Sequence, residues 1–246
     1  MCEACGCGDT AVVALDLHEK ILAGNERAAA HNREHFTSRN VLAVNLMGSP
    51  GSGKTAILEA TARRWGTAQQ GAVHPGGSHR VAAISGDLAT DHDARRLSAA
   101  GIPCVPITTG SACHHDAELV HRALGELNPD ALDFLFIENV GNLVCPAVYD
   151  LGQAVNVVAL SVTEGEDKPL KYPVMFAKAD LVLLTKIDLL PYLPEVCIEG
   201  VAQALARVMP AALLLPVSAR TGEGVDRWLE WLQDRAASVL SSRANH

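Results

Sequence analysis

The sequence predicts an α/β fold in which helices cover both faces of a mostly parallel central sheet. Short apolar runs recur along the chain from Val41 onward, and longer Ala-rich or amphipathic stretches separate them. Runs that are apolar nearly throughout are typical of strands buried on both faces, as in parallel sheets with crossover helices. The expected strands are 41–47, 80–85, 104–109, 134–138, 155–162, 181–185 and 213–218.

Composition allows one large domain and argues against two classes of partner. The chain has 246 residues, 48% of them apolar, which supplies a sizeable core. It has 28 Asp and Glu against 20 Lys and Arg and no long basic block, so the charge pattern of a nucleic-acid-binding protein is missing. The N-terminus lacks a signal-peptide pattern, and no stretch reaches the roughly 18 apolar residues of a membrane span. We therefore expect a cytoplasmic protein with no nucleic-acid partner and no membrane span.

Three segments are expected along the chain. The first, 1–10, is a flexible tail that carries Cys2, Cys5 and Cys7; the second, 11–36, is helical; and the third, 37–246, is the α/β domain. Seven cysteines in a reducing compartment do not indicate a disulfide framework, and an odd number cannot all pair within one chain. Each cysteine is therefore expected to be a small buried residue or a metal ligand.

A phosphate-binding loop is predicted where the first strand meets the following helix. The stretch 48–55 reads G-S-P-G-S-G-K-T and fits the pattern G-x-x-x-x-G-K-[ST]. Glycines let successive backbone N–H groups surround phosphate oxygens at a helix N-terminus, Lys54 reaches the β- and γ-phosphates, and Thr55 binds Mg²⁺. The expected nucleotide-binding residues here are Gly48, Ser49, Pro50, Gly51, Ser52, Gly53, Lys54 and Thr55.

Two further motifs favour guanine as the base. T-K-I-D at 185–188 resembles the N-K-x-D motif of GTPases, in which the Asp carboxylate, here Asp188, accepts hydrogen bonds from guanine. Thr185 replaces the usual Asn, so its supporting contact to the phosphate loop is open. V-S-A-R at 217–220 resembles the loop whose backbone amide meets guanine O6. In this order behind a phosphate loop, the motifs predict GTP and GDP as ligands, held by Lys186, Asp188, Ser218, Ala219 and Arg220.

Residues for hydrolysis are expected at the ends of two other strands. F-I-E-N-V-G places Glu138 where it would hold Mg²⁺ directly or through water, and Gly141 where its N–H would meet the γ-phosphate. Asp87, at the end of the second strand, is a second candidate for Mg²⁺ or the attacking water, with a helix N-cap as its alternative role. The predicted catalytic set is Lys54, Thr55, Asp87, Glu138 and Gly141.

A metal site near this machinery is suggested by cysteine and histidine spacing. Cys113 and His114 follow the third strand, and Cys145 lies four residues beyond Gly141. Four residues span at most about 14 Å, so a metal held by Cys145 would lie within one loop of the γ-phosphate sensor. Taken singly, each cysteine is more simply explained as buried and inert.

The chain as a whole resembles the nickel-incorporation GTPase of NiFe-hydrogenase maturation, a SIMIBI-class P-loop GTPase. The stretches that carry the resemblance are C-E-A-C-G-C, G-S-P-G-S-G-K-T, G-D-L-A-T-D-H-D-A-R, T-G-S-A-C-H-H-D-A, E-N-V-G-N-L-V-C-P, E-G-E-D-K-P-L-K-Y-P and T-K-I-D-L-L-P. The resemblance implies a P-loop GTPase domain over 37–246, slow GTP hydrolysis and a GTP-dependent homodimer. It also implies nickel delivery to the hydrogenase large-subunit precursor together with other accessory proteins.

The same resemblance implies two metal sites. A dimer-interface site for Ni²⁺ or Zn²⁺ maps onto Cys113, His114 and Cys145, and a tight nickel site maps onto the tail residues Cys2, Cys5 and Cys7. Three thiolates with an α-amine or another nitrogen suit planar Ni²⁺, whereas Zn²⁺ prefers a tetrahedral arrangement. The poly-His segment that some members use for nickel storage is absent from this sequence.

Two roles and two alternative functions stay open. Outer-shell or surface roles are favoured for His115 over direct ligation, and Lys168 could reach a nucleotide across a dimer. A purely regulatory GTPase is one alternative, but it does not explain the cysteine tail. A related nickel GTPase serving urease is the other, but the Cys-Pro-His motif expected of it is absent.

Overall fold

The computed structural model describes residues 10–66, 79–87, 91–108, 115–127, 132–211 and 213–243, with side chains from residue 22 onward except at 87, 108, 145, 240, 242 and 243. Its centre is a seven-stranded sheet with the order β3-β2-β4-β1-β5-β6-β7. All neighbouring pairs run parallel, which confirms the predicted fold class. The strands are β1 (Leu42–Met47), β2 (Val81–Asp87), β3 (Cys104–Thr108), β4 (Phe134–Glu138), β5 (Val155–Ser161), β6 (Leu181–Thr185) and β7 (Leu214–Pro216).

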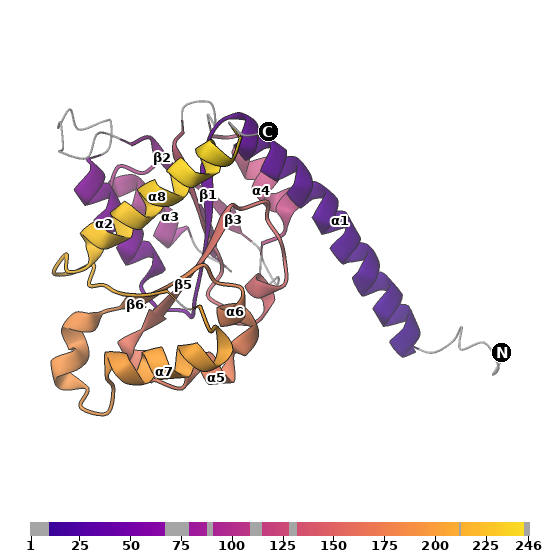
Figure 1. Ribbon diagram of the computed structural model, residues 1–246. Coiled ribbons are helices and arrows are strands. Elements are labelled where there is room, and N and C mark those ends of the chain that lie inside the picture. The colour runs from indigo at the N-terminus through magenta and orange to yellow at the C-terminus, as the bar shows by residue number, and fades with distance from the viewer. Residues whose placement is uncertain are drawn as a thin grey trace.

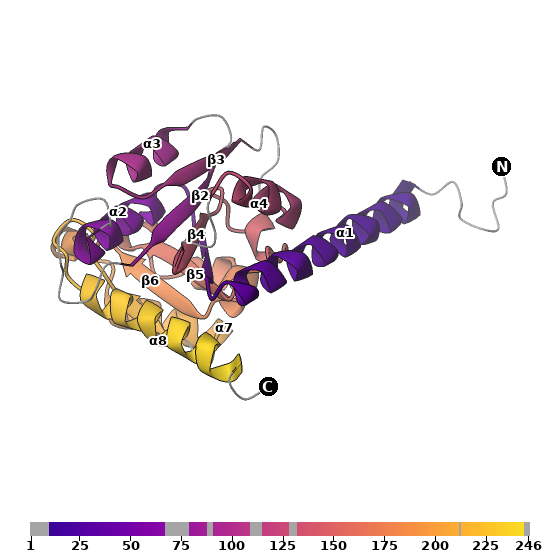
Figure 2. The ribbon, with the colours of Figure 1, turned by 90° about the horizontal axis from the view of Figure 1, so that it is seen from above.

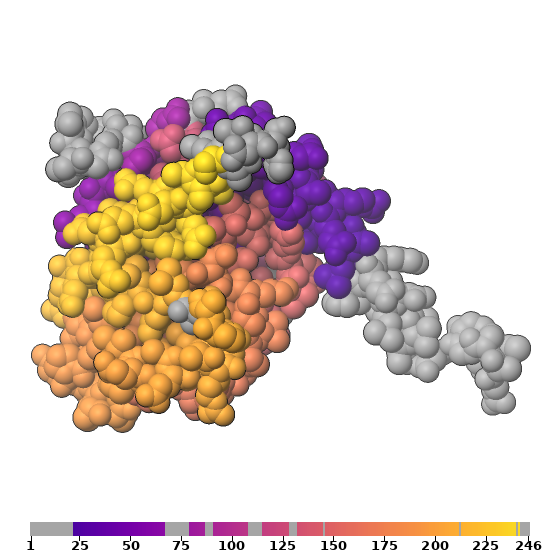
Figure 3. All heavy atoms as spheres, viewed as in Figure 1, coloured from indigo at the N-terminus to yellow at the C-terminus, as the bar shows by residue number. Residues whose placement is uncertain are grey.

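Helices follow most strands and cover both faces of the sheet (Figures 1 and 2). The α-helices are α1 (Thr10–Ser38), α2 (Lys54–Trp65), α3 (His92–Ala99), α4 (Ala117–Leu124), α5 (Lys168–Lys171), α6 (Pro173–Ala177), α7 (Ile198–Val208) and α8 (Val225–Arg243). Short 3-10 turns are η3 (Cys145–Ala147), η4 (Val162–Glu164) and η5 (Ile187–Tyr192). In the space-filling view, α8 (yellow) and the α7 region (orange) form adjoining parts of the surface (Figure 3).

Alternate residues of each strand point to opposite faces, and each face has its own core. Leu42, Val44 and Leu46 of β1 pack with α2, α3 and α8 in one buried cluster that also contains Trp228. On the opposite face, Ala43 belongs to a cluster formed with α1 and α4. Met47 belongs to a further cluster on that face, which α6 and α7 complete. Because strands are apolar on both faces, the sequence shows apolar runs rather than alternation.

The long N-terminal helix α1 packs on the domain through its C-terminal part and projects away from it toward the N-terminus (Figure 2). Phe36 is buried in the core shared with α4. Asn25 donates to Asp150 O and accepts from Ala117 N, and the fully buried Asn32 donates to Ala117 O and Leu151 O. These bonds fix the helix to the start of α4 and to the segment at 150–151 before β5. Among the described residues, no helix has the length and apolar character needed to cross a bilayer.

Candidate functional site

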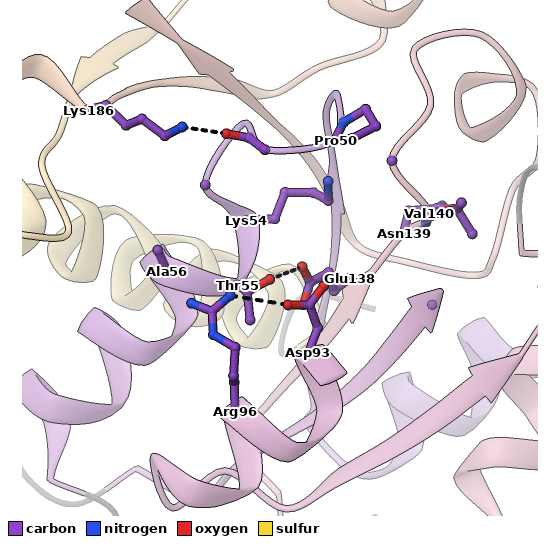
Figure 4. A pocket seen from close by; sticks show the side chains of 14 residues that line it. Pro50, Lys54, Thr55, Ala56, Asp93, Arg96, Glu138, Asn139, Val140 and Lys186 are labelled. Atoms are coloured by element: carbon purple, nitrogen blue, oxygen red, sulfur yellow. Dashed lines mark hydrogen bonds and ion pairs between the residues drawn. The ribbon is translucent and has the colours of Figure 1, made fainter. Parts of the chain in front are cut away.

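The predicted nucleotide motifs meet at one edge of the sheet. Because all strands are parallel, their carboxyl ends lie together, where ligands bind in open α/β sheets. The phosphate loop leaves β1 there, Glu138 ends β4, Thr185 ends β6, and 217–220 follows β7. A cavity of about 430 Å³ opens at this edge (Figure 4). Its lining includes Pro50, Gly51, Gly53, Lys54, Thr55, Ala56, Gly86, Asp93, Arg96, Glu138, Asn139, Val140, Gly141 and Lys186.

The phosphate loop depends on glycine at two of its positions. Gly53 is in the left-handed region, with φ 93° and ψ 17°, and directly precedes α2. Gly48 has φ 150°, and a Cβ there would overlap the carbonyl oxygen of Ala159 and the hydroxyl of Ser52. L-residues with side chains disfavour the first conformation and do not fit the second position. The N-terminus of α2 is thereby aimed into the cavity, where it favours an anion.

Lys54 and Glu138 bring opposite charges into the buried floor of the cavity. They are 7% and 2% exposed, respectively. Lys54 Nζ donates to the carbonyl oxygens of Gly48 at 3.2 Å and Ser49 at 3.1 Å. Burial lowers the pKa of Lys54, although the Glu138 carboxylate opposes that shift. Burial also raises the pKa of Glu138 to about 7, against the lowering effects of its hydrogen bond from Thr55 and the charge of Lys54.

Thr55 and Glu138 are joined by a hydrogen bond at the floor of the cavity. Thr55 Oγ1 donates to Glu138 Oε1 at 2.6 Å, from the first turn of α2 to the end of β4 (Figure 4). A hydroxyl and a carboxylate beside a phosphate loop are the oxygen donors that Mg²⁺ uses in nucleotide sites. The two side chains therefore fit a Mg²⁺ ion bound together with phosphates.

The loop after β4 lies directly against the phosphate loop. A Cβ at Gly141 would come within 2.8 Å of Pro50 Cγ and 2.9 Å of Pro50 N, so only glycine allows this approach. Asn142 forms an isolated antiparallel bridge with Gly48. The phosphate loop is therefore in direct contact with the segment that leads to Cys145.

An acidic and basic cluster on the cavity wall was not singled out from the sequence. Arg96 of α3 donates to both carboxylate oxygens of Glu59, each at 3.0 Å, and to Asp93 Oδ1 at 3.2 Å. Arg96 and Asp93 both line the cavity (Figure 4). The residues belong to two helices, so their meeting depends on the packing of α3 on α2. No local motif in the sequence signals it.

A second cavity, of about 320 Å³, adjoins the first, and four of the five predicted base-binding residues line it: Lys186, Asp188, Ala219 and Arg220. The two cavities share Gly53, Ala56 and Lys186. The second is also lined by Ile57, Thr185, Asp188, Leu189, Val217, Ala219 and Arg220, most of them apolar. A flat aromatic base beside a phosphate site fits such a lining.

Asp188 is oriented in this second cavity by a buried serine. Ser218 Oγ, fully buried, donates to Asp188 Oδ1 at 2.7 Å, and Thr221 N donates to Ser218 Oγ at 3.1 Å. The exposed Arg220 guanidinium lies 3.7 Å from Asp188 Oδ2. Ser218 therefore holds the Asp188 carboxylate in place through Oδ1. The other oxygen, Oδ2, faces the exposed Arg220 side chain, which a ligand can displace.

Thr185 makes a contact with the phosphate loop that the sequence left open. Its Oγ1 donates to Ser52 O at 2.6 Å and lies 3.4 Å from Leu160 O. Lys186, the next residue, has a left-handed backbone with φ 60°. Its side chain reaches the phosphate loop and donates through Nζ to Gly51 O at 2.6 Å (Figure 4). The two adjacent side chains clamp the phosphate loop to the end of β6.

The predicted metal ligands fall largely beyond the part of the chain that the structure describes. Cys2, Cys5, Cys7, Cys113 and His114 lie outside the described residues, and for Cys145 only the backbone, at the start of η3, is described. Among the side chains that are described, no group of three His, Cys, Asp or Glu forms a metal site. Both predicted metal sites therefore stay predictions.

The two remaining cysteines, Cys104 and Cys197, have described side chains. Cys104 packs against the core in β3, where burial raises the pKa of its thiol to about 12. Its thiol is therefore protonated at neutral pH, and Cys104 is a partly buried structural residue rather than a metal ligand. Cys197 is exposed at the N-cap of α7, where its sulfur accepts from Gly200 N at 3.3 Å. The expectation of a buried residue or a metal ligand was therefore wrong for Cys197, which caps a helix.

The structure excludes one of the two roles left open for each of two polar residues near the site. The N-cap of α3 is Asp91, so the alternative N-cap role of Asp87 is excluded; Asp87 ends β2, and its proposed catalytic role stays a prediction. His115 is completely buried, which excludes a surface role.

Lys168 lies beside its own helix rather than free in solvent. Its ammonium is 3.5 Å from Glu164 Oε2 and 5.3 Å from the centroid of the Tyr172 ring. Both partners hold the side chain near the carboxyl end of β5. Whether it reaches a nucleotide across a dimer stays a prediction.

Comparison with known proteins agrees with this geometry. A family profile described as "CobW/HypB/UreG, nucleotide-binding domain" matches residues 42–214. The chain is 47% identical over 229 residues to the hydrogenase maturation factor HypB of Azotobacter vinelandii, covering 93% of this chain and 72% of that protein. It is 37% identical over 232 residues to the hydrogenase/urease maturation factor HypB of Helicobacter hepaticus, covering 93% and 90%.

A solved structure extends the similarity to three dimensions. The crystal structure of HypB from Helicobacter pylori in complex with nickel superimposes with a TM-score of 0.79 at 35% sequence identity, covering 87% of this chain and 96% of that one. The sequence identity, the family profile and the fold all match HypB proteins. The chain belongs to the HypB hydrogenase maturation factors, a family of P-loop GTPases within the CobW/HypB/UreG group.

Proposed function

We propose that this protein hydrolyses GTP slowly and uses the nucleotide state to control the binding and delivery of nickel during NiFe-hydrogenase maturation. The observation that carries the GTP assignment is the joining of two cavities. A phosphate cavity with Lys54 on its floor continues, past Gly53 and Lys186, into an apolar cavity that contains the Asp188 carboxylate. A carboxylate accepts hydrogen bonds from guanine, whereas adenine offers no matching pair of donors.

Hydrolysis would use the residues already gathered at the sheet edge. Lys54 would exchange its bonds to the Gly48 and Ser49 carbonyl oxygens for bonds to the phosphates. Thr55 and Glu138 would exchange their mutual bond for Mg²⁺, whose charge stabilises the transferring phosphoryl group. The Gly141 N–H would meet the γ-phosphate, and Asp87 would orient water or Mg²⁺.

We expect slow turnover because Arg96, the arginine that lines the cavity, is already bound by two carboxylates. Arg96 lines the cavity, but Glu59 binds it through two hydrogen bonds and Asp93 through one. An arginine held by two carboxylates is not free to stabilise charge on the γ-phosphate. GTPases without a contributing arginine turn over at about 10⁻⁴–10⁻³ s⁻¹, and we expect a rate on that order.

Nickel binding is proposed at two places. Cys2, Cys5 and Cys7 would form a tight nickel site on the tail, and Cys113, His114 and Cys145 would bind Ni²⁺ or Zn²⁺ at the interface of a homodimer. Thiolate and imidazole ligands suit both metals. The 35% identical HypB of Helicobacter pylori, which was crystallised with nickel, supports nickel as the cargo.

Exposed apolar side chains support a dimer contact near Cys145. Val144 is 58% exposed and Val148 42% exposed, one on each side of η3. Val174 of α6, which packs near η3, is 58% exposed. A second copy of the chain placed over this surface would cover these valines and bring two Cys145 residues together. GTP would favour this dimer, because Gly141 and Cys145 share one loop.

Delivery to the hydrogenase large-subunit precursor, with other accessory proteins as partners, follows from the family. Urease is a second candidate recipient, because the 37% identical Helicobacter hepaticus relative is named for both enzymes. Against it stands the sequence at 145–147, which reads Cys-Pro-Ala where a Cys-Pro-His motif is expected of the urease-specific GTPases.

The test of nucleotide use combines hydrolysis with competition. Purified protein should release phosphate from GTP in the presence of Mg²⁺, and excess ATP should not displace a bound GTP analogue. Lys54→Ala should abolish hydrolysis, whereas Lys178→Ala, which removes an exposed lysine of another pocket, should leave it intact. Equal binding of ATP and GTP would refute the guanine assignment.

A further inference from the structure

Three histidines from two helices meet on the surface where α1 packs against α4 (Figure 1). His31 and His35 belong to α1, and His121 belongs to α4. The ring centroids of His31 and His121 are 4.8 Å apart, those of His35 and His121 are 6.4 Å apart, and those of His31 and His35 are 6.5 Å apart. His31 is exposed, and the other two are partly exposed. None of the three lines either nucleotide cavity.

The spacing of these histidines suits a metal ion. His31 and His35 are four residues apart on one helix, so their side chains lie on the same face and one turn apart. Two imidazoles in this arrangement can bind one ion, as the two histidines of the H-E-x-x-H zinc motif do. His121 adds a third ring from the facing helix α4, with its centroid within 6.4 Å of both others.

A buried asparagine orients the His121 ring. Asn32 is fully buried and donates through Nδ2 to Ala117 O at 2.8 Å and to Leu151 O at 3.1 Å, so its amide cannot be reversed without losing both bonds. Asn32 Oδ1 lies 3.1 Å from His121 Nδ1. Because an amide oxygen only accepts, Nδ1 carries the proton in the neutral ring and Nε2 keeps its lone pair. Metal-binding histidines have an outer hydrogen bond of this kind, which fixes the tautomer and the direction of the ring.

The rings need a small movement to share one ion. As they lie, no three donors among the described side chains are gathered closely enough to hold a metal. With metal–nitrogen bonds of about 2.0–2.1 Å, the ring centroids of two imidazoles on one ion are roughly 4.5–5.2 Å apart. The His31 and His121 rings already have this separation. His35 must approach them by about 1–2 Å, which rotation about its side-chain bonds can supply.

We propose that His31, His35 and His121 bind a divalent transition-metal ion, Ni²⁺ or Zn²⁺, and that the ion fastens α1 to α4. Imidazole nitrogen suits both metals, whereas Mg²⁺ and Ca²⁺ prefer oxygen ligands. Water would complete the coordination on the exposed side of His31. The ligands differ from those of the two cysteine sites proposed above, and this site does not depend on either of them.

The test uses the full-length protein with serine in place of five cysteines, which removes both proposed cysteine sites: Cys2, Cys5, Cys7, Cys113 and Cys145. Calorimetric titration with Zn²⁺ and, separately, with Ni²⁺ should show one bound ion per chain. The ion should also raise the melting temperature, by about 5–10 °C at a metal concentration 100 times the dissociation constant, because it binds the folded protein in preference to the unfolded chain.

Single substitutions show which histidines hold the ion. His31→Ala, His35→Ala and His121→Ala should each weaken metal binding by roughly tenfold or more and reduce the rise in melting temperature. His92→Ala, at an exposed histidine of α3, is the matched control and should change neither quantity. Because His31 is exposed, His31→Ala should fold like the starting protein, so its loss of metal cannot be attributed to unfolding.

Nuclear magnetic resonance of the ring nitrogens tests the proposed geometry without any histidine substitution. Addition of Zn²⁺ should move the His121 Nε2 resonance to the range of a metal-bound nitrogen, while Nδ1 stays protonated toward Asn32. An unchanged His121 ring would overturn the proposal. So would binding that weakens in His31→Ala and His35→Ala but not in His121→Ala, since that result shows only an adventitious pair on α1. Equal metal affinity in all four variants would overturn it as well.

Discussion

Thr55 Oγ1 and Glu138 Oε1 are 2.6 Å apart, joined by a hydrogen bond between the start of α2 and the end of β4. The bond partly compensates for a carboxyl group that is almost completely buried. It also holds the two oxygen atoms that we expect to bind Mg²⁺ next to each other.

The buried carboxyl makes the stability of the metal-free protein depend on pH. The folded pKa of Glu138, about 7, lies above its ordinary value of 4.5, so the folded state binds more protons than the unfolded state between these values. The free energy of unfolding should therefore fall as pH rises from about 4.5 to 7, by about 3 kcal/mol from this group. Denaturant unfolding of the nucleotide-free protein at several pH values measures the change.

Glu138→Gln is the control for that pH dependence, because it keeps the shape and an oxygen acceptor without a titrating proton. The variant should lose this contribution and unfold with a flatter pH profile over the same range. An unchanged slope in Glu138→Gln would show that another group is responsible.

Thr185→Val should weaken the clamp on the phosphate loop. Valine has the same shape but leaves the buried Ser52 carbonyl oxygen without the 2.6 Å hydrogen bond, which costs about 1–3 kcal/mol. We expect a lower free energy of unfolding and weaker GTP binding, by calorimetry and denaturant titration. Thr37→Val, at an exposed position on α1, should change neither. Full GTP affinity in Thr185→Val would mean that the loop does not need this contact.

Asp188→Asn should change the preferred base from guanine to xanthine. An amide cannot accept from the guanine donors as a carboxylate does, so GTP affinity should fall roughly 100-fold or more while xanthosine triphosphate binds better. Ser218→Ala should act more mildly, weakening GTP by about tenfold through the loss of the 2.7 Å bond that orients Asp188. Competition against a fluorescent GTP analogue gives both values. Loss of GTP and xanthosine triphosphate binding together would point to misfolding of the base cavity instead.

Serine in place of Cys2, Cys5 and Cys7 should remove the tight nickel site and its thiolate-to-metal charge-transfer absorbance. GTP hydrolysis should stay near normal, because the two nucleotide cavities are lined by residues between 50 and 220. Cys197→Ser, at an exposed cysteine on α7, is the matched control and should retain the absorbance. Full tight nickel binding by the triple variant would contradict a tail site.

The sequence predicted the parts of the protein that depend on local pattern. All seven strand positions agree with the structure to within two residues at each end, because buried parallel strands are continuous apolar runs. The phosphate loop, Glu138 and Asp188 also lie together as expected, since each directly follows a strand and all the strands are parallel.

What the sequence could not predict depends on packing between distant segments. Arg96 meets Glu59 only because α3 lies beside α2, and Asn45, Asn139 and Asn156 bond only because β4, β1 and β5 are neighbours. The sequence does not show whether a histidine or an asparagine lies in a solvated loop or in the core. A surface role was therefore kept open for His115, which is completely buried, and the contact of Thr185 with the phosphate loop was left open.

The central claim is that nucleotide and nickel act on one another through the loop that contains Gly141 and Cys145. Its most direct test is the affinity of a fluorescent, non-hydrolysable GTP analogue for the protein with tail serines, measured without metal and with saturating Ni²⁺. Binding free energies are reciprocal, so nickel should change the nucleotide affinity by the same factor of about 5 to 150 by which nucleotide changes nickel affinity. Cys145→Ala should erase that change. Identical nucleotide affinities with and without nickel would contradict the account, leaving a GTPase and a metal site that do not communicate.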